Sequence, residues 1–151
     1  MSQMIRGHRE TIRRQAKMAP EFMDITADVR DIVERSGVQE GSVIIFSRHT
    51  TAAVKINENE PLLLQDMTYF LKRIAPREAP YRHNDFAVRT ANMTEDECPN
   101  GHSHCQHLLM TTSETIPICS GELMLGRWQT LFLIELDRPR DREVIVQVQG
   151  W

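Results

Sequence analysis

Along this chain, hydrophobic residues recur with two different periods, and each period predicts one type of secondary structure. In residues 24–37, "DITADVRDIVERSG", apolar side chains return every three or four positions, which is typical of one buried helix face. The residues on that face are Ile25, Val29, Ile32 and Val33. Asp24 or Thr26 can cap the start, and Gly37 suits the left-handed residue that ends a helix.

A second helical pattern runs between two prolines. Pro61 fits a first helical turn and Pro76 ends the pattern, because proline lacks the amide that a helix interior needs. We expect one apolar stripe of this helix to be buried against the rest of the domain. The stripe consists of Leu63, Met67, Phe70, Leu71 and Ile74.

Short apolar or alternating runs predict the strands. The runs are "RGHRETIRRQAK" (6–17), "SVIIFS" (42–47), "AAVKI" (52–56), "ETIPICSG" (114–121), "ELMLGRWQTLFLIELD" (122–137) and "REVIVQVQG" (142–150). The first is rich in arginine and is interpreted as an exposed edge strand. The run 122–137 is expected to be one long strand, with Gly126 in its interior and Trp128 on the same face as Phe132.

Two helices among about six strands, mostly joined as hairpins, predict an α+β fold built on packed, mostly antiparallel sheets. The chain has no internal repeat and no Pro/Gly-rich linker, so residues 1–151 are expected to form a single domain. Residues 76–100 show no period, and loops of that length in compact domains are often functional. Residues 103–112, "SHCQHLLMTT", fit either a short helix or a strand.

The composition excludes several classes of protein. A net charge of -3 provides no basic field for nucleic acid, so no nucleic-acid partner is expected. No apolar run approaches the length of a membrane span, and no signal peptide opens the chain, so no membrane partner is expected either. Three cysteines, Cys98, Cys105 and Cys119, are odd in number and lack CxxC spacing. Reduced thiols and a cytoplasmic location are therefore expected.

The first candidate for chemistry is "SRHTTAAVKINENE" (47–60). A strand ends at Arg48 and His49, and the small residues that follow leave room for a pocket above the sheet. His49 can then act as a metal ligand or a proton carrier, with Asn57, Glu58 and Glu60 at the next strand-to-helix junction. An equally weighted alternative is that His49 is a hydrogen-bonded histidine at a strand end and that the acids cap the helix.

The second candidate is "NGHSHCQH" (100–107), which holds three of the six histidines. On a strand, His102 and His104 would share a face, as two metal ligands often do. On a helix, His104 and His107 would be neighbours instead. The alternative is a polar loop with solvated imidazoles.

The cysteines around this octapeptide do not make a convincing zinc site. Cys98, His102 and Cys105 lack the paired short spacings of a closed structural site. An open site with histidines from separate segments fits better, because a catalytic metal keeps a position for water or substrate. His83 in "PYRHND" supplies an imidazole from the long loop.

The third candidate combines "LGRWQ" with "ELDRPRDR". Gly126 allows close approach of a ligand, Trp128 can form an apolar wall, and Arg140 can bind phosphate or carboxylate. The alternative is a core tryptophan beside a charged turn, and for Arg138 and Arg142 the charged turn is favoured. The chain has no GxGxxG, P-loop, GxSxG or HExxH motif, which removes the usual nucleotide, hydrolase and zincin interpretations.

In this order, the pieces resemble one family. HTTAA, NExE, NGHxH, LGxWQ and ExDxPR occur together between about Thr11 and Gly150. The combination is similar to the YjbQ-like proteins, an uncharacterised family also called secondary thiamine-phosphate synthases. The resemblance implies a compact α+β domain of packed antiparallel sheets that assembles as a homotrimer. It also implies a ligand site built on the recurrent histidines.

The resemblance also implies roles for individual residues. His49 matches the HTT histidine, His83 the histidine of YxH, and His104 the second histidine of NGHxH. These three are the implied ligands of a divalent metal ion, zinc or magnesium. His102 matches a more variable position, and Arg127 stands where the family commonly has threonine.

The implied activity joins a pyrimidine pyrophosphate to a thiazole phosphate and releases pyrophosphate. The leaving group must be neutralised by a divalent ion or by basic groups. The implied catalytic residues are His49, Glu58 and His104. The implied substrate-binding residues are Arg48, Thr50, Asn57, Trp128 and Arg140. The alternatives are a non-catalytic trimer that binds a metal or small ligand, and a purely structural interaction module.

Overall fold

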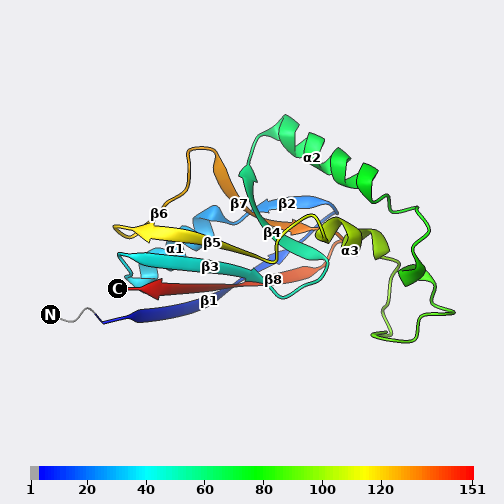
Figure 1. Cartoon of the computed structure of the whole chain (residues 1–151), viewed down its shortest axis with the longest axis horizontal. Helices are drawn as coiled ribbons and strands as arrows, with labels where there is room; N and C mark the ends of the chain where they lie inside the picture. The colour runs from blue at the N-terminus through cyan, green and yellow to red at the C-terminus, as the bar shows by residue number, and fades with distance from the viewer. Residues whose placement is uncertain (1–3) are drawn as a thin grey trace.

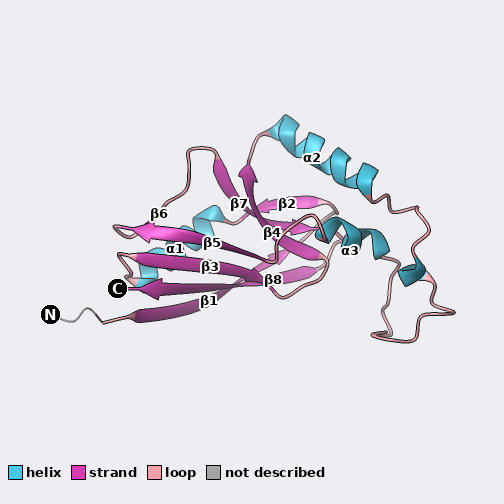
Figure 2. Ribbon diagram, in the orientation of Figure 1, coloured by secondary structure: helices cyan, strands magenta, loops and turns pink. Residues whose placement is uncertain are grey.

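The computed structural model describes residues 4–151 of the chain. The elements follow in the order β1 (Arg6–Gln15), β2 (Glu21–Asp24), α1 (Thr26–Ser36), β3 (Gly41–Ser47), β4 (Ala52–Glu58), α2 (Pro61–Ile74), the 3-10 turn η1 (Arg82–Asn84), α3 (Gly101–His107), β5 (Ser113–Cys119), β6 (Glu122–Leu123), β7 (Gln129–Glu135) and β8 (Asp141–Gly150) (Figure 1, Figure 2). Between residues 4 and 151, no helix is both long enough and apolar enough to cross a bilayer.

The strands form two sheets, and every neighbouring pair is antiparallel. The five-stranded sheet has the order β1-β8-β3-β5-β6 and the three-stranded sheet the order β2-β7-β4. The predicted α+β class is confirmed, and β1 is the expected arginine-rich edge strand. The expectation that most strands form hairpins is wrong. Among the strands of residues 4–151, only β5 and β6 are consecutive and paired, because β7 and β8 enter different sheets and β1 pairs with the last strand.

Two apolar clusters define the layers. The larger cluster fills the space between the two sheets and α1, and includes Val29, Ile45, Leu133 and Val146. A smaller cluster around Phe132 lies on the other face of the three-stranded sheet, where α2 packs. The three-stranded sheet is therefore covered on both faces, which agrees with the nearly continuous burial of β7 from Leu131 onward.

Helix α1 matches its predicted pattern. Val29, Ile32 and Val33 are buried, and the helix ends at Gly37 with φ at 68°, a conformation that glycine adopts at little cost. At the start, the Asp24 carboxylate accepts a hydrogen bond from the backbone N–H of Thr26 at 2.9 Å.

Helix α2 differs from its predicted burial. Of the expected stripe only Leu71 is buried, whereas Phe70 is 55% exposed and Ile74 is 49% exposed. The helix packs onto the cluster around Phe132 through Leu64 and Leu71 and otherwise stands away from the sheet (Figure 1). The prediction fails because helical period shows which residues share a face, not whether a single chain covers that face.

The predicted long strand is divided in two. β6 ends at Leu123, and residues 124–128 form a loop before β7. Within this loop the Gly126 amide donates to the side chain of Gln129 at 2.8 Å, and the Gln129 amide donates back to the Gly126 carbonyl at 3.0 Å. Gly126 is thus a turn residue, not a strand residue. Trp128 lies in the loop and is 62% exposed, so it does not share a strand face with Phe132.

Candidate functional site

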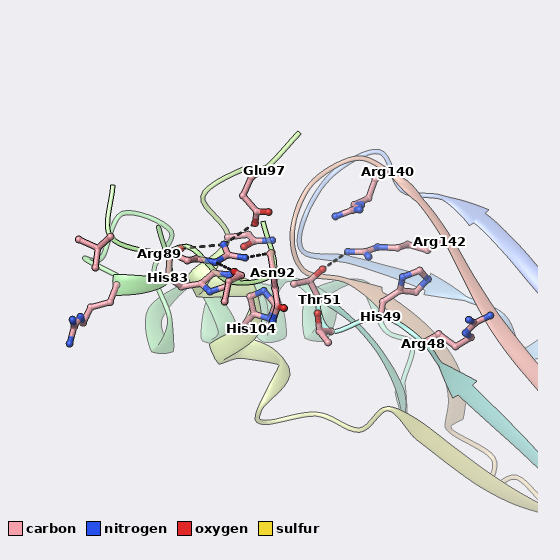
Figure 3. Close-up of a pocket in the computed structure, with 15 residues that line it drawn as sticks. Arg48, His49, Thr51, His83, Arg89, Asn92, Glu97, His104, Arg140 and Arg142 are labelled. Carbon is pink, nitrogen blue, oxygen red and sulfur yellow. Dashed lines mark hydrogen bonds and ion pairs between the residues drawn. The ribbon is translucent and has the colours of Figure 1, made fainter. Parts of the chain in front are cut away.

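One cavity of about 870 Å³ gathers most of the predicted site residues. It lies where the β3–β4 connection and the start of β8 face the long loop and α3 (Figure 3). The predicted residues that line it are Arg48, His49, Thr50, His83, His104 and Arg140. Five arginines and a single acid, Glu97, are among the lining residues, so the cavity favours an anionic ligand.

Arg142, for which the sequence favours a charged turn over a binding role, is the most firmly held of these arginines. Its side chain is 2% exposed and forms a bidentate pair with the fully buried Glu135, at 2.5 Å from Nε and 2.7 Å from Nη2. Nη2 also donates to the hydroxyl of Thr51 at 2.7 Å. Because Nη1 donates to no residue in the range 4–151, it is left for a ligand in the cavity.

Arg140 is held more loosely, by one hydrogen bond to a second buried carboxylate, and its side chain is 38% exposed. Its Nη1 donates at 3.0 Å to Oδ2 of Asp137, a side chain that is 1% exposed. The same oxygen accepts from Arg138 and from Asn100. The remaining donors of Arg140 face the cavity (Figure 3). Two guanidinium groups, each anchored on a buried carboxylate and each with spare donors, make a receptor suited to phosphate or carboxylate oxygens.

The opposite wall carries two imidazoles in contact. His83 from η1 and His104 from α3 lie edge to face, with ring centroids 4.7 Å apart (Figure 3). The Asn84 side chain accepts from the Gly101 amide at 2.9 Å, which ties η1 to the start of α3. Burial, and then the charge of His83, lower the pKa of His104, so its ring is neutral near pH 7.

His49 is engaged by the backbone. The last β3–β8 pair is Ser47 with Val144, and the His49 ring lies just beyond it, with Nε2 3.1 Å from both N and O of Glu143. This is the arrangement of the alternative interpretation, in which His49 is a hydrogen-bonded histidine at a strand end. Only Nδ1 of the ring is then free to face the cavity. Burial, and next the charge of Arg142, lower the pKa of His49.

Arg89 shapes the long loop. Its guanidinium donates to the carbonyls of His83, Ala91 and Asn92 and to the Glu97 carboxylate, the last at 2.9 Å. Its side chain is only 14% exposed. We conclude that Arg89 closes the loop and is not available to bind a ligand. The sequence gives no local signal for this role, because the partners are mostly backbone carbonyls.

The predicted metal site is not formed. No group of three or more His, Cys, Asp or Glu placed to hold an ion occurs within residues 4–151. His83 and His104 meet, but Nε2 of His49 is occupied by the Glu143 backbone, and Glu58 does not line the cavity. The residues present therefore do not fit a divalent ion held jointly by the three histidines.

Asn57, Glu58 and Trp128 are separated from this cavity. β4 starts beside Thr51 and ends at Glu58, which pairs with Gln129. Seven residues of strand span about 20 Å, so these three residues lie at the far end of the sheet. The neighbouring Glu60 is the helix cap of the alternative interpretation, because its carboxylate accepts from the amides of Leu62 and Leu63.

The octapeptide "NGHSHCQH" forms α3 and not a strand, and the helix sends its histidines to different places. His104 lines the main cavity, whereas His102 is buried, with Nε2 3.2 Å from the Ser103 hydroxyl. His107 lines no part of the cavity.

Four buried or partly buried histidines lead us to expect that the protein loses stability on mild acidification. Burial is the largest cause of the lowered pKa of His49, His102, His104 and His107 in the native state. Below about pH 6.5 the unfolded chain binds protons that the native protein does not. The free energy of unfolding should fall by up to about 1.4 kcal/mol per pH unit for each such histidine.

Urea unfolding at a series of pH values checks this expectation. The dependence should be absent above about pH 7.5, where histidine is neutral in both states. His102→Gln should reduce the slope. A free energy of unfolding that stays constant as the pH falls through the histidine range would contradict the prediction.

Comparison with known proteins gives a consistent result. A family model described as "UPF0047 protein YjbQ-like" matches residues 10–151. A UPF0047 protein of Methanothermobacter thermautotrophicus is 40% identical over 130 residues, covering 86% of this chain and 83% of that protein. A UPF0047 protein of Synechocystis sp. is 37% identical over 150 residues, covering 96% and 93%.

Solved structures agree in fold. A YbjQ-like protein of unknown function from Sulfolobus solfataricus superposes with a TM-score of 0.87 at 30% identity, covering 98% of this chain and 100% of that one. An uncharacterised conserved protein from Clostridium acetobutylicum gives a TM-score of 0.81 at 34% identity, covering 92% and 98%.

Proposed function

This chain belongs to the YjbQ-like UPF0047 family, and we propose that its cavity binds a phosphorylated small molecule. The observation that carries the proposal is the pair Arg140 and Arg142. Each is held by a buried carboxylate and keeps donors free on the cavity side. A receptor fixed before the ligand arrives loses little conformational entropy on binding, which favours affinity.

We propose further that the bound molecule reacts as a pyrimidine pyrophosphate with a thiazole phosphate. The thiazole nitrogen forms a bond to the methylene carbon of the pyrimidine, and the C–O bond to pyrophosphate breaks. The electron pair of that bond leaves with pyrophosphate. Arg140 and Arg142 support this reaction because negative charge grows on the leaving group, and preorganised donors stabilise such charge. The reaction requires no nucleophile from the protein.

Arg140→Gln should weaken pyrophosphate binding about tenfold, because it removes one charged donor from the cavity. Titration calorimetry with pyrophosphate measures this directly. Arg138→Gln is the matched control, since Arg138 donates to the same Asp137 oxygen but does not line the cavity. Equal losses of affinity in the two variants would show that the Asp137 cluster matters only for folding.

The proposed reaction is tested with the purified protein, both thiamine precursors and a range of divalent ions. We expect thiamine phosphate and pyrophosphate in equal amounts, and less of both products from Arg140→Gln. Absence of product under every condition would exclude the synthase activity. Pyrophosphate binding without turnover would then leave a non-catalytic ligand-binding protein.

A further inference from the structure

A second cavity, of about 260 Å³, lies on the other side of α3 from the main cavity. His102 and Gln106 line the second cavity, whereas His104 lines the main one. Residues four apart share a helix face, and a residue midway between them lies on the opposite face. No residue lines both cavities, so the second cavity is distinct from the one that holds Arg140 and Arg142.

His102 presents a hydrogen-bond acceptor that no residue uses. Its side chain is buried, and burial, followed by the charge of Arg77, lowers the pKa of the ring, which is therefore neutral near pH 7. The Ser103 hydroxyl donates its only proton to the Leu136 carbonyl at 2.9 Å, so its oxygen accepts from Nε2–H of His102, 3.2 Å away. A neutral imidazole has one N–H, so Nδ1 is an acceptor, and it has no partner among residues 4–151.

Gln106 presents a second acceptor of the same kind. Its Nε2 donates to the carbonyls of Leu71 and Ala75, both at 3.2 Å, and this fixes which end of the amide carries the oxygen. The oxygen, Oε1, is buried and has no partner among residues 4–151. Buried acceptors are nearly always satisfied in folded proteins. Two unpartnered acceptors on one cavity therefore point to a ligand that brings two donors.

The mouth of the second cavity carries charged side chains. Lys72, Arg77 and Glu78 line it and are exposed, and none of them forms an ion pair within residues 4–151. Arg77 is held at the cavity because its Nη2 donates to the Asp137 carbonyl at 2.6 Å. Two cations against one carboxylate leave an excess of positive charge, which favours an anionic group at the mouth.

We propose that the second cavity binds a small carboxylic acid that carries hydroxyl groups, of the sugar-acid class. The carboxylate pairs with Lys72 and Arg77 at the mouth, and two hydroxyls donate to Nδ1 of His102 and Oε1 of Gln106 at the buried end. Hydroxyl groups suit this end better than an ammonium group, because a buried charge is costly and both acceptors are neutral. The proposal does not depend on the proposed function of the main cavity.

The size of the second cavity limits the ligand further. Its volume of about 260 Å³ lies below the range of about 300–1,000 Å³ that is usual for ligand pockets. A three-carbon acid such as glycerate, which has two hydroxyls and one carboxylate, matches both the size and the groups that the cavity presents.

The first experiment compares three probes by titration calorimetry with the wild-type protein. Glycerate should bind at least about tenfold more tightly than propionate, which has the same carbon chain and carboxylate but no hydroxyls. It should exceed glycerol, which has no carboxylate, by a similar factor. A site built to accept from hydroxyls rejects the analogue without them, because its polar groups then stay unpartnered. Absence of glycerate binding, or equal affinity for glycerate and propionate, overturns the proposal.

The second experiment locates the bound glycerate with variants. Lys72→Gln should weaken binding about tenfold, because it removes one cation from the mouth. Arg73→Gln is the matched control, since Arg73 is the next residue of α2 and its guanidinium lies over the Tyr69 ring, away from the cavity lining. Arg140→Gln, which alters only the main cavity, should leave glycerate affinity unchanged. An equal loss of affinity in Lys72→Gln and in either of the other variants overturns the proposal.

The third experiment tests the buried acceptor. His102→Phe should reduce the preference for glycerate over propionate, because it removes Nδ1 while keeping a ring in place. If circular dichroism shows that this variant is unfolded, the ¹⁵N resonance of Nδ1 in the wild type is measured instead. That resonance should shift on addition of glycerate and not of propionate. An unchanged preference in the folded variant, or an unchanged resonance, overturns the proposal.

Discussion

Glu135→Gln should lower the free energy of unfolding by about 3–5 kcal/mol, because it leaves the charge of Arg142 buried without its counterion. Both side chains are almost fully buried, at 0% and 2% exposure. Glu135 also accepts from the backbone amides of Asp137 and Arg138, so it orders the turn that carries Arg140. We therefore expect the loss of stability to be accompanied by weaker pyrophosphate binding.

Chemical denaturation of the variant measures the effect. The control is Arg13→Gln, because Arg13 is 76% exposed and lies 3.6 Å from Glu143, where a surface pair contributes at most about 1 kcal/mol. The double variant Glu135→Leu with Arg142→Met should recover much of the stability, since a buried ion pair can be replaced by apolar residues. A loss in Glu135→Gln no larger than that of Arg13→Gln would contradict the assigned role.

Phe132→Ala is expected to cost about 3–5 kcal/mol, because it leaves a cavity at the centre of the smaller apolar cluster. Phe132 is fully buried and packs edge to face against Phe22, with ring centroids 5.7 Å apart. Leu71 of α2 belongs to the same cluster. The substitution therefore weakens both the three-stranded sheet and the attachment of the helix.

Thermal and urea unfolding of Phe132→Ala check this value. Phe70→Ala on α2 is the matched control, because it makes the same change at a phenylalanine that is 55% exposed. A surface substitution of that kind is expected to change stability by no more than about 0.5 kcal/mol. Similar losses of stability in the two variants would show that the face of α2 that carries Phe70 is covered in solution.

The local sequence pattern is sufficient to predict most helices and strands, but not which strands pair with one another. The helix ending at Gly37 and the alternating strand β8 follow from short-range period and turn chemistry. The pairing of β1 with β8 joins the first strand to the last, and no local signal specifies it. At the interruption, the Gln129 side chain accepts a hydrogen bond from the Gly126 amide, a contact that the alternating pattern does not reveal.

The site was predictable in its residue types but not in its geometry. His49, His104 and Arg140 do meet around one cavity. The sequence favours a charged turn for Arg142 because it does not show that the partner Glu135 is buried. Glu58 and Trp128 were grouped with the histidines although the length of β4 separates them within one chain. Spacing along a strand shows the face of a residue, and its distance from the site depends on the tertiary structure.

The shallow attachment of α2 affects the local unfolding of the protein. The helix is anchored to the sheet through Leu64 and Leu71, while the cluster between the sheets and α1 continues without it. Local unfolding needs only the free energy of the contacts that are broken, so α2 can detach while the two sheets remain folded. We therefore expect the backbone amides of α2 to exchange with solvent through partial opening before those of the strands, once the two hydrogen bonds from the Gln106 side chain to the carbonyls of Leu71 and Ala75 are broken.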